Sequence, residues 1–287
     1  MGPVFALLTA LLLAASDVLT RRLFVGDAAS RPRDVLTLRL LLSVPLLALA
    51  LPVAGSPPSA AEFWIIVAVG APLEIAALLL YLGALRAGPI STSLPLLAAT
   101  PVLLLVAGPV IAGDEPAPAA APGVLLVAAG AYALHLGKIR QGWAEPLLAL
   151  ARSRGARMML GVAVIYSITS ALGKRGVVVS SPAVMAVYYF LAVAVLGSPV
   201  ARPRTVLRLV RAHTALAVRI GLASTAQLFT HMAALALMPA AEMIALKRLS
   251  LLFGSAAGVF LLGERGGRAR LAGAALMVAG AIWIGVS

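Results

Sequence analysis

Ionisable side chains inside apolar segments are the residues of this sequence that could do chemistry. Glu74 lies at the middle of the apolar run 63–85, and Tyr81 follows two helical turns later on the same face. A charged group at that depth is costly and is a functional candidate by default. Because a carboxyl group can bind and release a proton there, Glu74 is predicted to carry a coupling proton. The structural alternative is a carboxylate that braces a buried arginine.

A second polar group follows Pro239. Glu242 is assigned with Glu74 to proton coupling, and Lys247 and Arg248 are predicted to bind an anion. At about 1.5 Å per residue, Lys247 lies roughly 12 Å from the start of its helix. A guanidinium can hold a carboxylate or phosphate with two parallel hydrogen bonds. The alternative is an internal salt-bridge network that joins both glutamates to the basic pair.

Weaker candidates surround these residues. Gln227 and His231 share one helix face, and an i,i+4 polar pair either binds a solute or joins helices. Asp17 can pair locally with Arg21, while Arg39 and Arg219 are near enough to helix ends to extend toward headgroups. The residues predicted to bind substrate are Lys247, Arg248, Tyr81, Gln227, His231, Ser91 and Ser250.

The composition excludes several protein classes. Of 287 residues, 62% are hydrophobic and 11% are charged, so the chain lacks the polar surface of a soluble protein and must be solvated by lipid. The absence of Cys excludes thiol catalysis and disulfides. His231 has no second His at metal-binding spacing, and no nucleotide-binding or zinc-protease motif occurs. The sequence therefore predicts neither an enzyme nor a cofactor, a metal site or an ATP-driven pump.

Ten apolar runs are each long enough to approach the thickness of a bilayer. They are 3–19, 35–53, 63–85, 89–112, 121–136, 158–173, 182–200, 215–237, 240–262 and 271–286. They predict an all-α integral membrane protein with ten transmembrane helices. A polar stretch between the fifth and sixth runs divides the chain into a repeat at 1–137, a cytoplasmic linker at 138–157 and a repeat at 158–287.

The two halves align without a gap when the sequence is shifted by 150 residues. Gly123 then falls on Gly273 and Gly130 on Gly280, and Gly113-Asp114 falls on Gly263-Glu264. Close packing explains why glycine is used but not why the spacing is shared. Because each half has an odd number of spans, the second half enters the membrane from the opposite side. The sequence therefore predicts two inverted five-helix repeats, as in secondary transporters.

Basic residues predict the orientation. Seventeen of them fall in the odd-numbered loops, whereas Lys174 and Arg175 are the basic residues of the even-numbered loops. The positive-inside rule therefore places both termini outside the cytoplasm. The net charge of +13 is spread over short loops without interleaved aromatic residues, so it indicates topology and not nucleic-acid binding. A basic amphipathic segment, 205–213, is predicted to lie on the anionic inner leaflet.

Three segments of the first half form a recognisable pattern: Tyr81-Leu82-Gly83-Ala84-Leu85, Ile90 to Thr100 with Pro101-Val102, and Gly113-Asp114-Glu115. The second half repeats its end as Leu261-Leu262-Gly263-Glu264-Arg265. With this pattern the sequence resembles EamA-type members of the drug/metabolite transporter superfamily. The resemblance implies two inverted bundles around a central cavity formed mainly by spans one, three, four, six, eight and nine. The Lys247-Arg248 pair also looks like a pair in plastid triose-phosphate translocators that contacts the substrate's phosphate.

These observations predict a secondary active transporter in the cell inner membrane. Its substrate is expected to be a small polar metabolite that carries a carboxylate or phosphate, moved by alternating access as an exporter or exchanger and coupled to protons. The expected partners are this solute and membrane lipids. The alternative is a flippase of a phosphorylated lipid carrier, or a membrane accessory subunit, in which the basic pair would meet a headgroup.

Overall fold

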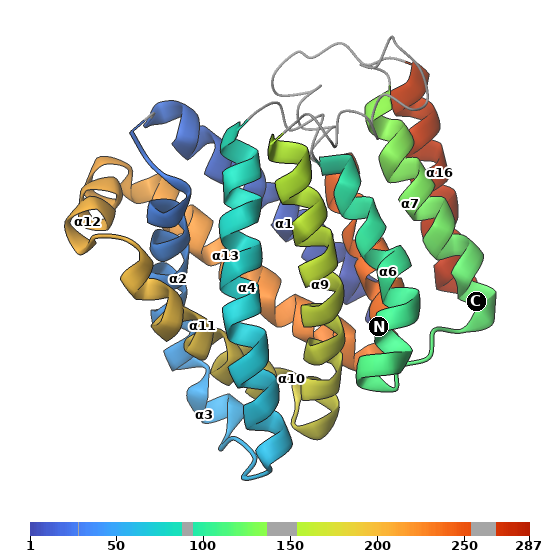
Figure 1. Ribbon diagram of the computed structural model, residues 1–287, viewed down its shortest axis with the longest axis horizontal. Coiled ribbons are helices and arrows are strands. Elements are labelled where there is room, and N and C mark those ends of the chain that lie inside the picture. Colours follow the sequence, from blue (N-terminus) through green and yellow to red (C-terminus); the bar gives the residue numbers. More distant parts are fainter. Residues whose placement is uncertain (28, 88–93, 137–153, 254–267) are drawn as a thin grey trace.

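A computed structural model describes residues 1–27, 29–87, 94–136, 154–253 and 268–287. Those ranges are helical and contain no strand (Figure 1). Ser91, the acidic match Glu264 and most of the predicted linker lie outside the described residues.

Five helical segments of the described chain are long and apolar enough to cross a membrane. They are α1 (Gly2–Gly26), α4 (Ala61–Ala87), α9 (Arg154–Val179), the segment Pro182–Val200 and α13 (Thr214–Leu237). Shorter apolar helices cover Leu96–Ala112, Pro118–Ala133 and Ala272–Val286. The chain is therefore a multi-pass helical membrane protein, and five of the ten predicted spans meet the length criterion.

Helix boundaries differ from the apolar runs where charged residues continue a helix. α7 (Ala121–Leu136) coincides with its predicted span, 121–136. α16 (Arg268–Val286) begins three residues before its own predicted span, 271–286. α9, by contrast, continues through Lys174 and Arg175, which the sequence analysis placed in a loop. That placement was wrong, because α9 extends to Val179. Both charged side chains have polar partners on neighbouring segments, which compensates their charge within the helix. α2 (Pro32–Leu49) likewise begins with charged residues and is followed by the short α3 (Leu51–Ala54).

Spans four and nine are interrupted at corresponding positions. The described part of span four begins with a 3₁₀ helix, η1 (Leu94–Ala98), continues as α6 (Ala99–Ala107) and ends in a π-helical turn, η2 (Gly108–Ala112). In span nine, α14 (Ala240–Lys247) is followed by Arg248, which forms a turn before helix resumes at Leu249. Ala98 and Arg248 are separated by 150 residues, the offset of the sequence repeat. Helix interruptions of this kind often mark functional positions.

Span seven contains a further irregular turn. It consists of α10 (Pro182–Val184), a π-helical turn η4 (Met185–Tyr189), α11 (Phe190–Gly197) and a 3₁₀ turn η5 (Ser198–Val200). The π turn holds Tyr189, whose ring packs beside Gly70 of α4. A Cβ at Gly70 would come within 2.8 Å of that ring. Glycine therefore allows α4 and span seven to approach closely at this level.

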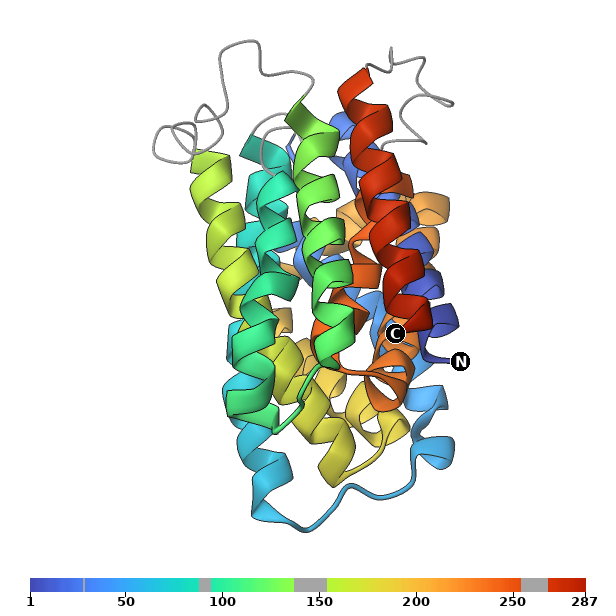
Figure 2. The same cartoon turned by 90° about the vertical axis from the view of Figure 1, so that its right-hand side faces the viewer.

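The helices pack in pairs that join the two halves of the chain. α1 packs on α13, α4 packs on α9, and α7 packs on α16 along the side of the bundle (Figures 1 and 2). Smaller contacts join α2 to α11 and α6 to α14. In each of these pairs, one helix comes from residues 1–136 and the other from residues 154–287.

Glycines set the contact between α7 and α16. A Cβ at Gly123 would lie 2.9 Å from the carbonyl oxygen of Gly280, and a Cβ at Gly130 would lie 2.7 Å from that of Gly273. Because the obstructing atoms are backbone, a side chain could not be accommodated by a rotamer change. The glycines that align in sequence at an offset of 150 therefore meet crosswise in space.

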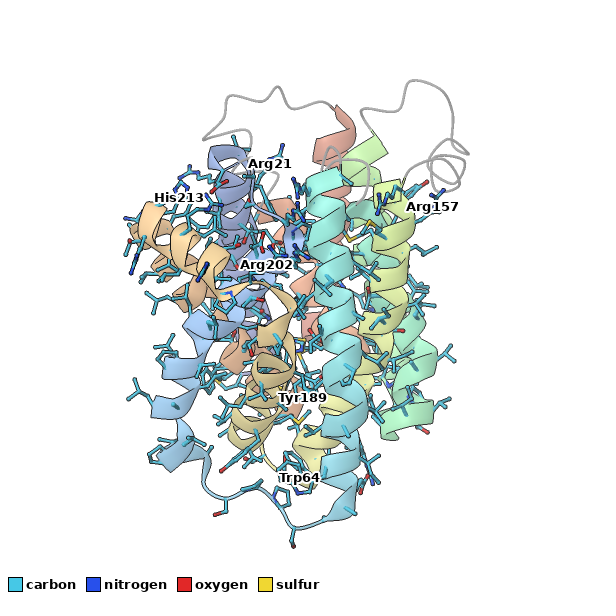
Figure 3. All side chains as sticks on the ribbon, turned by 60° about the vertical axis from the view of Figure 1, so that its left-hand side comes forward. Arg21, Trp64, Arg157, Tyr189, Arg202 and His213 are labelled. Atoms are coloured by element: carbon cyan, nitrogen blue, oxygen red, sulfur yellow. The ribbon has the colours of Figure 1, made fainter. Side chains whose placement is uncertain are left out.

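Arginines gather at one end of the bundle. Figure 3 shows Arg21, Arg157 and His213 toward this end, and Trp64 at the opposite end. The short helix α12 (Pro203–Ala212) lies on the side of the bundle near the arginine-rich end and leads into α13 (Figure 1). The fold thus has a basic end and an opposite end where α4 begins.

Candidate functional site

A cavity with polar and apolar lining residues and a volume of about 100 Å³ lies among α1, α2, α4, α9, α13 and spans four, seven and nine. Since roughly 10–15 Å³ of such space holds one water, the cavity has room for several waters or a small solute. The charged side chains that line it within the described chain are Arg39, Glu74, Lys247 and Arg248. Three cations thus face a single carboxylate, which favours an anionic occupant.

Arg248 occupies the turn that interrupts span nine. Its Nη2 donates a hydrogen bond of 2.9 Å to the hydroxyl of Thr100, and the residue is only 3% exposed. The Nε of Arg248 is buried and has no hydrogen-bond partner. A buried donor without a partner is costly, so this guanidinium retains capacity for a ligand or water.

Lys247 is the adjacent cation at the same interruption. Its Nζ lies 3.5 Å from Nδ1 of His231. The tautomer of His231 decides whether Nδ1 accepts a hydrogen bond from Lys247. The carboxylates that interact electrostatically with Lys247 are Glu74 and Asp17. The ion pairs recorded in the described chain join Arg33–Asp34, Lys174–Asp114, Arg175–Glu62 and Arg208–Asp27. None of them involves Lys247 or Arg248, so the recorded pairs do not include the network considered as the alternative.

Glu74 faces the cavity from the middle of α4, with the hydroxyl of Thr169 as its neutral polar neighbour. Pro72 lies two residues earlier inside the helix. Proline lacks an amide proton and locally removes one helical hydrogen bond. Tyr189 faces the same cavity, and its buried hydroxyl has no partner.

Asp17 and Arg39 complete the polar surroundings of the cavity. The hydroxyl of Tyr81 donates a hydrogen bond of 2.6 Å to Oδ2 of Asp17, so the expectation that Asp17 pairs with Arg21 was wrong. Arg39 lines the cavity and its Nη1 is buried without a partner, which corrects the expectation that it extends to headgroups. Arg219 is exposed on the surface of α13, consistent with that expectation.

The remaining sequence candidates divide clearly. Tyr81, Gln227, His231 and Ser250 line the cavity with Lys247 and Arg248. Glu242 is not among the lining residues. Its Oε1 instead accepts a hydrogen bond of 3.2 Å from the amide of Ala117, at the connection between η2 and α7. The structure therefore brings Glu74, but not Glu242, to the cavity.

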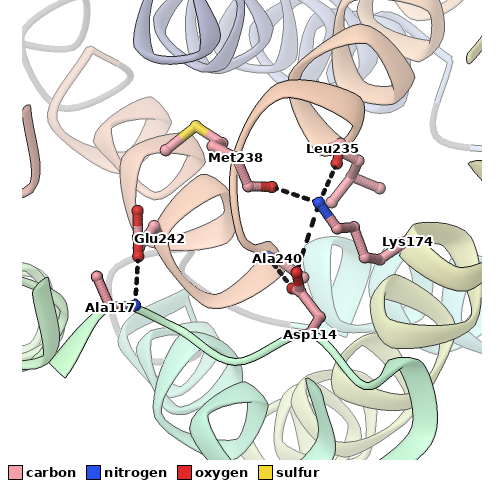
Figure 4. A network of polar contacts seen from close by, with 7 residues as sticks. All are labelled: Asp114, Ala117, Lys174, Leu235, Met238, Ala240 and Glu242. Carbon is pink, nitrogen blue, oxygen red and sulfur yellow. Dashed lines mark hydrogen bonds and ion pairs between the residues drawn. The ribbon is translucent and has the colours of Figure 1, made fainter. Parts of the chain in front are cut away.

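A second polar network holds the two halves together beyond the cavity (Figure 4). Lys174 of α9 donates hydrogen bonds to the carbonyl oxygens of Leu235 (2.8 Å) and Met238 (3.0 Å), and its Nζ is 3.4 Å from Oδ1 of Asp114. Oδ2 of Asp114 accepts a hydrogen bond of 2.6 Å from the amide of Ala240, the first residue of α14. We call Asp114, Lys174 and these backbone groups the polar latch.

The latch combines a charge pair with a helix cap. A carboxylate at a helix N-terminus satisfies an unpaired amide and interacts favourably with the helix dipole. Asp114 comes from the first half of the chain, whereas Lys174 and α14 come from the second half. The latch therefore fixes the end of span four against spans six, eight and nine. Within the described ranges, no group of three or more His, Asp or Glu side chains could hold a metal ion.

This fold and this cavity define a multi-pass helical membrane protein with a cavity that is lined by helices from both halves of the chain. Residues 1–136 match the model of the EamA-like transporter family, so the chain carries an EamA-like transporter domain and is a membrane transporter, not an enzyme. No curated protein matches the chain.

A solved structure, whose title reads "Crystal structure of protein", is similar to the chain with a TM-score of 0.72 at 18% sequence identity. The match covers 98% of this chain and 94% of that chain, so the two structures share their fold over nearly their whole lengths.

Proposed function

We propose that this protein is a secondary active transporter that moves a small metabolite bearing a carboxylate or phosphate by alternating access. The observation that carries the proposal is the cavity itself, where Arg39, Lys247 and Arg248 face one carboxylate, Glu74. Buried cations are tolerated when partners neutralise them. An anionic solute is such a partner, and the unpartnered donors of Arg39 and Arg248 are available to bind it.

The helix contacts support an inverted repeat. If residue 150 + i is equivalent to residue i, the pair α1 and α13 is equivalent to the pair α9 and α4, and both pairs are in contact. The pair α7 and α16 is equivalent to itself, and Gly123–Gly280 and Gly130–Gly273 are the crosswise contacts expected of a two-fold relation. We therefore retain the ten-span architecture, with repeats at 1–137 and 158–287 joined by 138–157.

The polar latch supports alternating access. It joins both halves at the end of the bundle where spans four, six and eight end, and it would have to open for a solute to enter the cavity from that side. With the predicted topology, this is the non-cytoplasmic side of the cell inner membrane, and both chain termini face it. The interrupted spans four and nine supply the backbone irregularity that transporters of inverted-repeat type use near their binding sites.

Glu74 is proposed to couple transport to protons. It is the carboxylate among the charged residues lining the cavity in the described chain, and it lies near Lys247. An entering anion and a proton would both change the charge balance around this carboxylate. Glu242 lies instead near the polar latch, so any part it has in coupling would act there.

A thermal-shift experiment tests the proposal with defined probes. Purified protein would be heated with inorganic phosphate, with glycerol phosphate, with succinate, and with the uncharged solute glycerol as a matched control. A ligand that binds the folded state alone raises its apparent stability. We expect at least one anion to raise the Tm in a concentration-dependent way, and Lys247→Ala to remove that shift. Stabilisation by glycerol alone, or an undiminished shift in Lys247→Ala, would contradict the proposed anion site.

A further inference from the structure

The short helix α12 is fixed against the bundle by its apolar side. Val206 and Leu209 are buried and pack with Leu38 of α2 and Ala217 of α13. Because this packing fixes the rotation of α12 about its axis, the opposite face of the helix is held away from the bundle.

That opposite side carries a basic stripe with an apolar residue inside it. Arg204, Leu207, Arg208 and Arg211 are spaced i, i+3, i+4 and i+7, which places them along one helix face. All four are exposed, and Leu207 is 48% exposed. An exposed leucine among arginines is typical of helices that lie in a membrane interface, where the aliphatic side chain enters the headgroup region and the cations meet phosphates.

The end of α1 continues this basic surface. Arg21 and Arg22 are exposed near the end of α1, and Gly26 lies close to the ring of His213, at the start of α13. Figure 3 shows Arg21, Arg202 and His213 on this side of the molecule.

One acidic side chain ties the two segments together. Oδ2 of Asp27 accepts a hydrogen bond of 2.7 Å from Nη1 of Arg208. This hydrogen bond holds the pKa of the Asp27 carboxyl below its usual value. A depressed carboxylate pKa means that the pair is intact at neutral pH and is lost only when the pH falls through that lowered value. Arg204 and Arg211 have no ion pair recorded within the described chain, so the surface keeps a net positive charge.

We propose that the exposed stripe of α12 and the end of α1 form a binding surface for anionic phospholipid headgroups. A basic loop that merely sets topology needs exposed charges, but it needs neither a fixed helix nor a leucine within the basic stripe. If the long apolar helices cross the bilayer, this end of the bundle lies at its surface. Anionic lipids attract basic residues that are close to that surface. The inference rests on the membrane location of the chain and is independent of the transported solute.

The test compares lipid binding of three purified full-length proteins in detergent. They are the wild type, the double variant Arg204→Gln/Arg211→Gln, and Arg154→Gln, which removes an exposed arginine from the start of α9 at the same end. Each would be titrated with phosphatidylglycerol and with phosphatidylcholine, and both the Tm and the binding of a fluorescent phosphatidylglycerol would be measured. Because the substituted side chains are exposed, the variants are expected to fold.

We expect wild type and Arg154→Gln to bind phosphatidylglycerol more strongly than phosphatidylcholine and to be stabilised by it. The double variant should bind phosphatidylglycerol roughly 30-fold more weakly, since each of the two basic residues near an anionic surface contributes separately. Equal effects of the two lipids on the wild type would overturn the proposal. So would an undiminished preference in the double variant, or an equal loss in Arg154→Gln, which would show a diffuse effect of charge.

Discussion

The guanidinium of Arg248 and the hydroxyl of Thr100 are joined by a hydrogen bond of 2.9 Å. Arg248 stands at the interruption of span nine, and Thr100 is the second residue of α6, directly after the interruption of span four. The irregular positions of the two halves thus meet at the wall of the cavity. This contact joins a planar cation of the second half of the chain to a hydroxyl of the first half at the cavity.

Arg248→Lys should weaken binding of the anionic substrate. A lysine cannot reproduce two parallel hydrogen bonds to a carboxylate or phosphate, nor keep the Thr100 contact at the same time. Loss of one hydrogen bond to a charged group costs about 1.5–3 kcal/mol, so the Kd should rise roughly 10- to 100-fold. Arg219→Lys, on the exposed surface of α13, is the matched control and should bind like the wild type. Equal affinities of all three proteins would make Arg248 structural.

Glu74→Gln should separate exchange from proton coupling. The amide keeps the size of the side chain but cannot release a proton, so solute exchange in proteoliposomes should remain measurable while the response to a pH gradient is lost. Glu62→Gln, near the start of the same helix and half-exposed, serves as the control and should keep the response. If Glu74→Gln retains the pH dependence of the wild type, the proton is carried elsewhere.

Lys174→Gln should open the polar latch. The substitution removes the ion pair to Asp114 and disrupts the contacts to two carbonyl oxygens. Because the chain has no Cys, Ser170→Cys at the cavity provides a single site for labelling. A membrane-impermeant maleimide added from the side of the latch should label this site several-fold faster in Lys174→Gln. Arg175→Gln, which breaks the neighbouring half-exposed pair with Glu62, should not change the rate. An unchanged rate in Lys174→Gln would show that the latch does not control access.

Gly280→Ala should destabilise the contact between α7 and α16. The new Cβ would lie 2.6 Å from the carbonyl oxygen of Gly123, and overpacking against backbone costs about 1–3 kcal/mol. Gly285→Ala, one and a half turns later in the same helix, meets no atom within 4 Å and is the control. Thermal unfolding should show a lower Tm for Gly280→Ala alone. Equal Tm values for the two variants would mean that the helices separate without cost.

The sequence was sufficient to identify the polar cavity residues that lie inside long apolar runs. Glu74, Lys247 and His231 interrupt long apolar runs, so the cost of burying them singled them out, and all three line the cavity. The bounds of α7 were predictable because its apolar run lies between the breaker Asp114-Glu115-Pro116 and the polar stretch that begins at Gly137.

Residues with a plausible local explanation were misread. Asp17 has Arg21 one turn away, but its hydrogen-bond partner is Tyr81, 64 residues distant. Lys174 ends an apolar run and therefore looked like a loop residue, whereas its partners lie on α13 and on the connection that follows η2. The interruption at Arg248 has no glycine or proline to announce it. Each of these features depends on contacts between distant segments, which periodicity and composition do not encode.

The most direct test of the account is uptake of a labelled anion into proteoliposomes that contain no ATP. The anion would be the one that raises the Tm of the wild type, and the liposomes would be preloaded with the same unlabelled anion. We predict exchange by the wild type and by Arg219→Lys, with exchange abolished in Lys247→Ala and strongly reduced in Arg248→Lys. Wild-type rates of exchange in both Lys247→Ala and Arg248→Lys would contradict the assignment of the basic pair as the anion-binding end of the transport site.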